Sequence, residues 1–124
     1  MVLVVEPDIL ARITIADYLR DCGFKVFEGA SADEALAVLG SGRKIDVILA
    51  EVQLAGRMDG FALARWVRER HPDVDMILTS GIARAAAKAG DLCEEGPLEK
   101  PYHPQEAVRR INILRERRRA TLRA

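Results

Sequence analysis

The sequence predicts an α/β fold in which a parallel sheet is covered by helices on both faces. Short apolar runs, typical of buried strands, alternate five times with longer stretches whose apolar residues recur at helical spacing. The runs at residues 2–5 and 45–50 are almost wholly apolar, as expected for strands buried on both faces. This strand–helix order indicates a three-layer sandwich. No repeat, linker or low-complexity segment interrupts residues 1–124, so we expect one domain.

The first strand and helix occupy the N-terminal segment. Residues 2–5 are β-branched or leucine and predict a central strand. Residues 8–21 carry apolar side chains at helical spacing, and Gly23 ends this helix. Asp8 is expected to cap its first turn. We expect the inner face of the helix to comprise Ala11, Thr14, Ile15, Tyr18, Leu19 and Cys22.

Two further strand–helix pairs follow. Residues 25–28 alternate in polarity and predict a strand near the edge of the sheet. Residues 31–39 begin with a capping box, a serine followed three residues later by a glutamate, and predict a second helix. The strand at residues 45–50 leads through a long loop to a third helix over residues 60–70.

The C-terminal part continues the alternation. Residues 76–79 predict a strand, residues 83–89 an alanine-rich helix, and residues 98–99 a short strand. Pro104 suits the first turn of a final helix. The inner stripe of that helix is expected to comprise Ala107, Val108, Ile111 and Leu114.

Charge and composition narrow the function classes. The 19 basic and 19 acidic residues cancel, so the chain as a whole has no polyanion-binding signature. Residues 101–124 hold seven arginines and two glutamates, but a charge run at a helix end is usually solvated, and no aromatic residues are interleaved with it. We therefore expect no nucleic-acid binding. Isolated Cys22 and Cys93 suit a reducing compartment, and no apolar run approaches ~18 residues, so we expect a cytoplasmic chain without membrane spans.

Four polar side chains follow the ends of the predicted strands. Glu6 comes directly after the first strand, Glu51 after the third, Ser80 after the fourth and Lys100 after the fifth. In an open parallel sheet, ligands and chemistry gather in the crevice beyond the carboxyl ends of the strands. The sequence therefore predicts that two acids, a hydroxyl and a lysine meet in one cleft.

This constellation resembles the receiver domain of two-component response regulators, over essentially all of the chain. The resemblance rests on five segments, Val4-Val5-Glu6, Asp46-Val47-Ile48-Leu49 leading into Glu51, Met58-Asp59-Gly60, Thr79-Ser80-Gly81 and Lys100-Pro101. It implies a flavodoxin-like (βα)5 fold with sheet order 2-1-3-4-5 and a role in bacterial phosphorelay signalling.

The resemblance also implies roles for individual residues. Active receivers take a phosphoryl group onto an aspartate after strand three, and that aspartate and an acidic pair after strand one hold magnesium. Here Glu51 stands at the phosphoacceptor position and Glu6 at the first position of the acidic pair. The second acidic position is Pro7. Ser80 and Lys100 match the residues that grip the phosphoryl oxygens.

The departures from the family pattern have physical consequences. Pro7 has no side-chain oxygen, which weakens a magnesium site and leaves Glu6 and Glu51 as its candidate ligands. Glu51 is longer than aspartate by one carbon–carbon bond, about 1.5 Å, which moves its carboxylate into the phosphoryl space. We therefore expect Glu51 and Lys100 to lie within about 4 Å of each other. The resemblance implies that the bond between Lys100 and Pro101 is cis.

The leading hypothesis is a degenerate receiver, or pseudo-receiver, that is not an enzyme and acts as a protein-interaction module. Its partner would be a sensor histidine kinase or another signalling protein. A homodimer would use the face formed by residues 83–89, the fifth strand and the final helix. Pro97 stands where the family has its switch aromatic. Two alternatives remain, a phosphorylatable receiver with a weak magnesium site, and a nucleic-acid binder acting through the C-terminal arginines.

Overall fold

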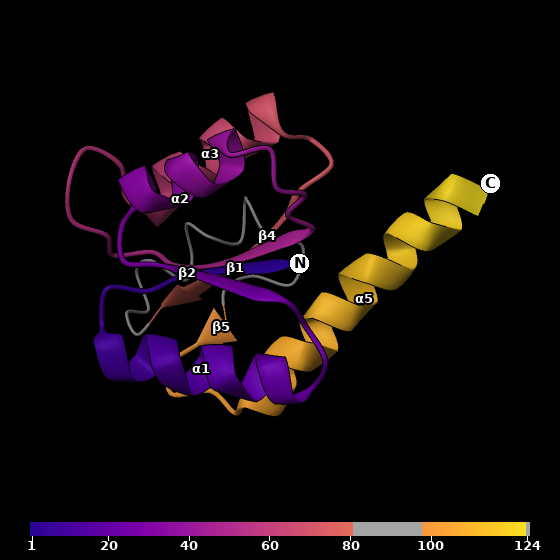
Figure 1. Cartoon of the computed structure of the whole chain (residues 1–124), viewed down its shortest axis with the longest axis horizontal. Helices are drawn as coiled ribbons and strands as arrows, with labels where there is room; N and C mark the ends of the chain where they lie inside the picture. The colour runs from indigo at the N-terminus through magenta and orange to yellow at the C-terminus, as the bar shows by residue number, and fades with distance from the viewer. Residues whose placement is uncertain (81–97, 124) are drawn as a thin grey trace.

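The computed structural model describes residues 1–80 and 98–123 and contains one parallel sheet of order β2-β1-β3-β4-β5 (Figure 1). This confirms the expected sheet order. The strands are β1 Val2–Val5, β2 Val26–Gly29, β3 Val47–Glu51, β4 Asp75–Ser80 and β5 Leu98–Glu99. The helices are α1 Ile9–Asp21, α2 Ala32–Gly40, α3 Gly60–Arg70 and α5 Pro104–Arg123. The expected helix at residues 83–89 and the position of Pro97 lie outside the described residues. Within them, no helix has the length and apolar character that crossing a membrane requires.

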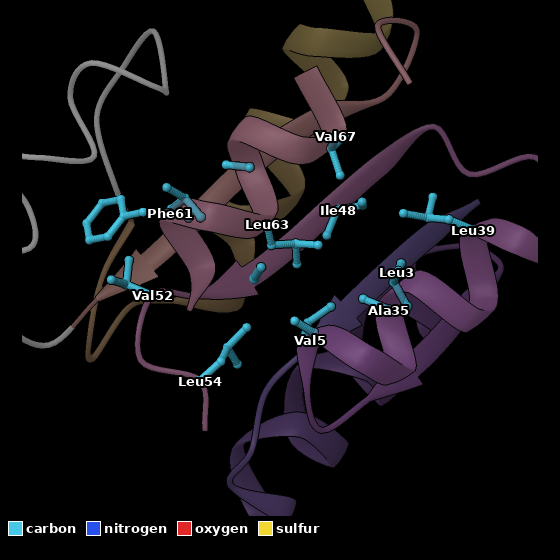
Figure 2. Close-up of a cluster of buried hydrophobic side chains, with 14 of the residues drawn as sticks. Leu3, Val5, Ala35, Leu39, Ile48, Val52, Leu54, Phe61, Leu63 and Val67 are labelled. Carbon is cyan, nitrogen blue, oxygen red and sulfur yellow. The ribbon is translucent and has the colours of Figure 1, made fainter. Parts of the chain in front are cut away.

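Helices cover both faces of the sheet, with α2 and α3 on one side and α1 and α5 on the other (Figure 1). Successive side chains along each strand point alternately into the two hydrophobic layers. Leu3 and Ile48 pack beneath α2 and α3, where Figure 2 shows them beside Leu39 and Leu63. The layer under α1 and α5 contains Val4 of β1 together with Leu49 of β3, Ile77 of β4 and Leu98 of β5. Two cores therefore hold the sheet between the helix pairs.

Side-chain caps define where the helices begin. The carboxylate of Asp8 accepts a hydrogen bond from the backbone N–H of Ala11 at 3.1 Å, which confirms its expected role at the start of α1. Asp59 caps α3 in the same way, through the N–H of Ala62 at 2.8 Å. Ser31 caps α2, as its capping box predicted.

Strand β3 is shifted relative to the prediction and includes Glu51. The backbone N–H of Val52 donates to the carbonyl of Thr79 at 2.9 Å, so pairing with β4 continues past residue 50. Ile45 is buried but precedes the ladder. The acid expected just after the strand is therefore held within it.

The expected inner face of α1 was partly wrong. Ile15 and Leu19 are buried as expected, together with Ala16, but Ala11, Thr14 and Cys22 are exposed. The reason is an arginine that the apolar pattern ignored. Arg12 turns inward, where its Nε lies 3.3 Å from Glu28 Oε1 on β2 and its guanidinium donates to the carbonyl of Glu6 at 2.9 Å. The face of α1 that is turned to the protein therefore includes Arg12 together with Ile15, Ala16 and Leu19.

Helix α5 packs on the sheet through its first half and projects away from it in its last turns (Figure 1). Its expected inner stripe is confirmed, with Ala107 and Ile111 buried and Val108 and Leu114 packed against them. Farther along, the Arg118 guanidinium binds both carboxylate oxygens of Asp75, at 2.7 and 2.9 Å, and donates to the carbonyl of Pro72. This two-pronged contact ties the projecting turns to the start of β4.

Replacing Arg118 with methionine should lower the free energy of unfolding by about 1 kcal/mol, because a two-pronged ion pair and a backbone contact are lost. The matched control is Arg119→Met, since the pair that Arg119 forms in the described part of the chain is with exposed Glu116, one helical turn away. That variant should change stability by roughly 0.3 kcal/mol or less. Urea unfolding measures both. Equal effects of the two substitutions would show that the Asp75 contact does not anchor α5.

Candidate functional site

The register of the sheet gathers polar side chains at the carboxyl ends of four strands. Glu51 pairs with Thr79 across β3 and β4, and Glu6 and Lys100 directly follow β1 and β5. Each of these four residues stands two positions after a buried residue of the layer under α1 and α5, namely Val4, Leu49, Ile77 and Leu98. Because strand side chains repeat with period two, all four are aimed to the same side of the sheet.

Lys100 bridges two buried carboxylates at this edge. Its ammonium contacts Glu6 Oε1 and Glu51 Oε2. Each glutamate side chain is 9% exposed and that of Lys100 is 30% exposed. The expected pairing of Glu51 with Lys100 is confirmed, and Glu6 joins it. We call these three residues the Glu6–Lys100–Glu51 cluster.

Backbone and hydroxyl donors hold both carboxylates in place. Glu6 Oε2 accepts from the N–H of Asp8 at 3.1 Å, and Glu51 Oε1 accepts from the N–H of Gln53 at 3.1 Å. The Thr79 hydroxyl donates to Glu51 Oε2 at 3.2 Å. Each carboxylate oxygen therefore has a hydrogen-bond donor, as is usual for buried polar groups.

Burial and the two glutamates shift the pKa values of side chains at this edge of the sheet. Burial lowers the pKa of Lys100, but hydrogen bonds and charge from Glu51 and Glu6 outweigh it and raise this pKa above its ordinary value. Burial also raises the pKa of the nearby Tyr102 phenol to about 12. At neutral pH the Lys100 side chain is therefore positively charged, and the Tyr102 phenol is neutral.

The residues at this edge do not fit magnesium. Mg²⁺ requires oxygen ligands in near-octahedral geometry, and the side chain of Pro7 offers none. One carboxylate oxygen of Glu6 and one of Glu51 are already in contact with the Lys100 ammonium. In the described part of the chain, no three His, Cys, Asp or Glu side chains are grouped as metal ligands.

Ser80, the hydroxyl singled out by the sequence, lies at the end of β4 and is 1% exposed. Its carbonyl accepts from the N–H of Lys100 at 2.9 Å, and the bond from Lys100 to Pro101 is cis, as expected. Its assigned role in gripping an anion stays a prediction. The hydroxyl that bonds Glu51 is that of Thr79, which sequence reasoning missed. Counting by twos from Ile77 would have found it.

The arginine-rich end of α5 lies away from this cluster and is partly committed to internal contacts. The Arg115 guanidinium lies over the ring of Phe24, 5.4 Å from its centre, and Arg118 binds Asp75. A cavity of about 460 Å³ here is lined by both basic and acidic side chains, Asp46 and Asp73 among them. Mixed charge of this kind offers little to a polyanion.

Comparison with known proteins gives a consistent family. Residues 2–112 match the model of the response regulator receiver domain. Sensor kinase CckA of Brucella abortus is 30% identical over 119 residues, covering 94% of this chain and 12% of that protein. Regulatory protein VirG of Rhizobium rhizogenes is 34% identical over 120 residues, covering 94% of this chain and 48% of that protein. The chain thus spans about half or less of these curated relatives.

Solved structures show the same fold. A receiver domain protein from Clostridium thermocellum superposes with a TM-score of 0.86 at 22% identity, covering 97% of both chains. NtrX from Brucella abortus, solved in complex with ADP, has a TM-score of 0.81 at 26% identity and covers 97% of this chain and 29% of its own.

Proposed function

The chain belongs to the response regulator receiver domain family, and from this premise we propose that it is a pseudo-receiver that works as a protein-interaction module. Receiver domains are generally signalling modules rather than enzymes, and they interact with kinases and other signalling proteins. In this proposal one receiver fills residues 1–124, acts in the cytoplasm and binds a sensor histidine kinase or another signalling protein. Glu51 stands permanently in place of a phosphorylatable aspartate.

The observation that supports this proposal is the Lys100 ammonium lying between Glu6 and Glu51. The lysine that would hold an incoming phosphoryl group is already neutralised by two carboxylates. The longer side chain of Glu51 brings its own negative charge to the place where that group would lie. An incoming anion would have to break both contacts and would meet the remaining carboxylate charge.

The groups available to assist phosphoryl transfer also support a pseudo-receiver. Phosphoryl transfer depends on cations that neutralise the charge of the transferred group. Pro7 supplies no metal ligand, and the Lys100 ammonium is already paired with Glu51. A displacement on the order of 1 Å at a reacting atom can cost about 100-fold in rate. The proposed module therefore signals through its surface rather than through a change at Glu51.

Intact-mass spectrometry after incubation with acetyl phosphate and magnesium tests the proposal. The unmodified chain should show no stoichiometric phosphate increment. Glu51→Asp alone should gain little, because a metal ligand is still missing. Pro7→Asp combined with Glu51→Asp should gain more than the two single changes together, since one supplies the ion site and the other the acceptor.

A phosphate increment on the unmodified chain, mapped to Glu51, would replace this proposal with the phosphorylatable receiver. The nucleic-acid alternative is tested separately. Retention of the chain on DNA at low salt, lost at high salt and lost in Arg115→Ser, would support it. We expect no such retention.

A further inference from the structure

Glu6, the acid of the cluster that follows β1, is held at its backbone as well as at its carboxylate. Its N–H donates to the carbonyl of Gly29 on β2 at 2.9 Å, and its own carbonyl accepts from the Arg12 guanidinium at 2.9 Å. Its two carboxylate oxygens contact the Lys100 ammonium and the N–H of Asp8. Each polar group of this buried residue therefore has a partner within the chain.

The segment between β1 and α1 leaves Glu6 few conformations. Pro7 follows it directly, and a residue before proline is restricted mainly to extended backbone conformations. The proline ring also fixes its own φ angle. Asp8 then caps α1 through the N–H of Ala11. Because this segment is short and stiff, a contact that fixes the Glu6 carbonyl also fixes the direction in which the Glu6 side chain leaves the backbone.

Arg12 supplies that contact from the first turns of α1. Its side chain is 17% exposed, and its Nε lies 3.3 Å from Glu28 Oε1 on β2. The same guanidinium donates to the Glu6 carbonyl. A guanidinium presents its donors in a rigid plane, so it can hold a carboxylate and a carbonyl at a fixed separation. Arg12 thus joins the edge strand β2 to the residue that contacts Lys100.

A second arginine of the same helix shows what is particular to Arg12. Arg20 also binds Glu28, at 3.1 Å from Oε2, and it donates to the carbonyl of Val26 on β2. Within the described residues, the contacts of Arg20 do not reach Glu6. Both arginines therefore anchor α1 to β2, and of the two it is Arg12 that also contacts the cluster.

We propose that Arg12 is a positioning residue for the Glu6–Lys100–Glu51 cluster: held by Glu28, its guanidinium fixes the Glu6 backbone so that the Glu6 carboxylate meets Lys100. The inference rests on the proposed function, because it names the residue that keeps the lysine engaged by two acids. Arg12 acts through the backbone of Glu6. Without this contact the Glu6 carboxylate moves away from β5, and Lys100 is left with Glu51.

The amide signal of Asp8 tests this role, because the Asp8 N–H donates to Glu6 Oε2 at 3.1 Å and so reports the position of that carboxylate. In the ¹⁵N-labelled chain, Arg12→Met should move this signal in the direction in which Glu6→Gln moves it. Arg20→Met is the matched control, since it also removes a partner of Glu28, and it should leave the Asp8 signal in place.

Arg12→Lys is a second variant that keeps the fold if Arg12→Met does not. It preserves a positive charge beside Glu28 but lacks the planar set of donors that holds two acceptors at once. The Asp8 amide signal of Arg12→Lys should move in the same direction as that of Arg12→Met.

Thermodynamic coupling provides an independent measurement of the same link. Lys100→Met should raise the unfolding equilibrium constant by a factor that is at least about 10-fold smaller in an Arg12→Met background, because Glu6 has already left the lysine. In an Arg20→Met background that factor should change by less than about 2-fold. Urea unfolding of the single and double variants gives these factors.

Three outcomes would overturn the proposal. They are an Asp8 signal that neither Arg12 variant moves, an equal movement in Arg20→Met, and additive effects of Arg12→Met and Lys100→Met. Each would leave Arg12 as an anchor of α1 without a role in the cluster. The phosphorylation experiment reads a mass increment on Glu51 and these experiments read Glu6 in the unphosphorylated chain, so either result can fail without the other.

Discussion

Replacing Lys100 with methionine is expected to lower the free energy of unfolding by about 3 kcal/mol, because it leaves Glu6 and Glu51 buried without their shared cation. Each carboxylate keeps one backbone donor, from Asp8 and from Gln53, but these neutral groups do not cancel two negative charges. Urea unfolding at neutral pH measures the loss. Lys44→Met is the control, since Lys44 is an exposed lysine in the loop before β3. The Lys44→Met change should alter the free energy of unfolding by roughly 0.5 kcal/mol or less.

Removing one of the two buried acids that have lost their cation should partly restore the stability of the Lys100→Met variant. In that background, Glu51→Gln should recover at least about 1 kcal/mol, whereas in the unmodified chain the same substitution should destabilise, because it breaks a buried pair. The opposite signs are the signature of coupled residues. If Lys100→Met alone were as mild as Lys44→Met, the cluster would have to be a solvated contact, and the argument that Lys100 is engaged by two buried acids would fail.

Alkaline pH offers a second measurement of the same contact. The pKa of Lys100 is raised in the fold, so folding favours its charged form. The resulting stabilisation is fully present below the ordinary lysine pKa of 10.5 and disappears as pH rises through the higher folded pKa. Tyr102 acts in the same direction, since its pKa rises from 10.0 to about 12. Urea unfolding of a Tyr102→Phe variant across this pH range isolates the contribution of Lys100 to the free energy of unfolding. Adding Lys100→Met to that variant should abolish the remaining loss of stability at high pH.

The sequence predicted the sheet because its strands are short apolar runs and its helices carry strong caps. Strand order could not come from periodicity, which says nothing about which strands are neighbours, and it came from the family resemblance. The apolar pattern misplaced the inner face of α1, because Arg12 enters the interface with β2 through an ion pair with Glu28. A long-range charge pair of this kind leaves no trace in a hydrophobic period.

The candidate site was predictable in outline from the positions where the strands end. Side chains that follow parallel strands meet at one edge, so the meeting of Glu51 and Lys100 could be expected. Glu6 was also expected in this cleft, but its direct contact with Lys100 depends on the register of β1 against β3, which a single sequence does not specify. Ile9 and Ile13 lie outside the expected inner face of α1, and the structure leaves both of them exposed.

Replacing Gly60 with alanine is the second large effect that we expect. Gly60 opens α3 and is buried against the end of β3 (Figure 2 shows the adjoining Phe61 and Val52). A methyl group on Gly60 would collide with the carbonyl oxygen of Glu51 and lie 2.7 Å from Val52 Cα. Both atoms are backbone, so no rotamer change can relieve the contact. The Gly60→Ala substitution should therefore cost about 3 kcal/mol, the upper end for overpacking.

Gly40→Ala is the matched control for Gly60→Ala. Gly40 is also helical, but a methyl group there meets no atom within 4 Å, so the change should stabilise by up to about 1 kcal/mol through helix propensity. Urea unfolding of both variants gives the comparison. The strained variant should also disturb the site, because the clash moves the strand that carries Glu51. The amide signals of Gln53 and Thr79 should then shift in Gly60→Ala and stay in place in Gly40→Ala. A neutral Gly60→Ala variant with unmoved signals would show that α3 can retreat from β3 without effect, and that the close approach does not position Glu51 against Lys100.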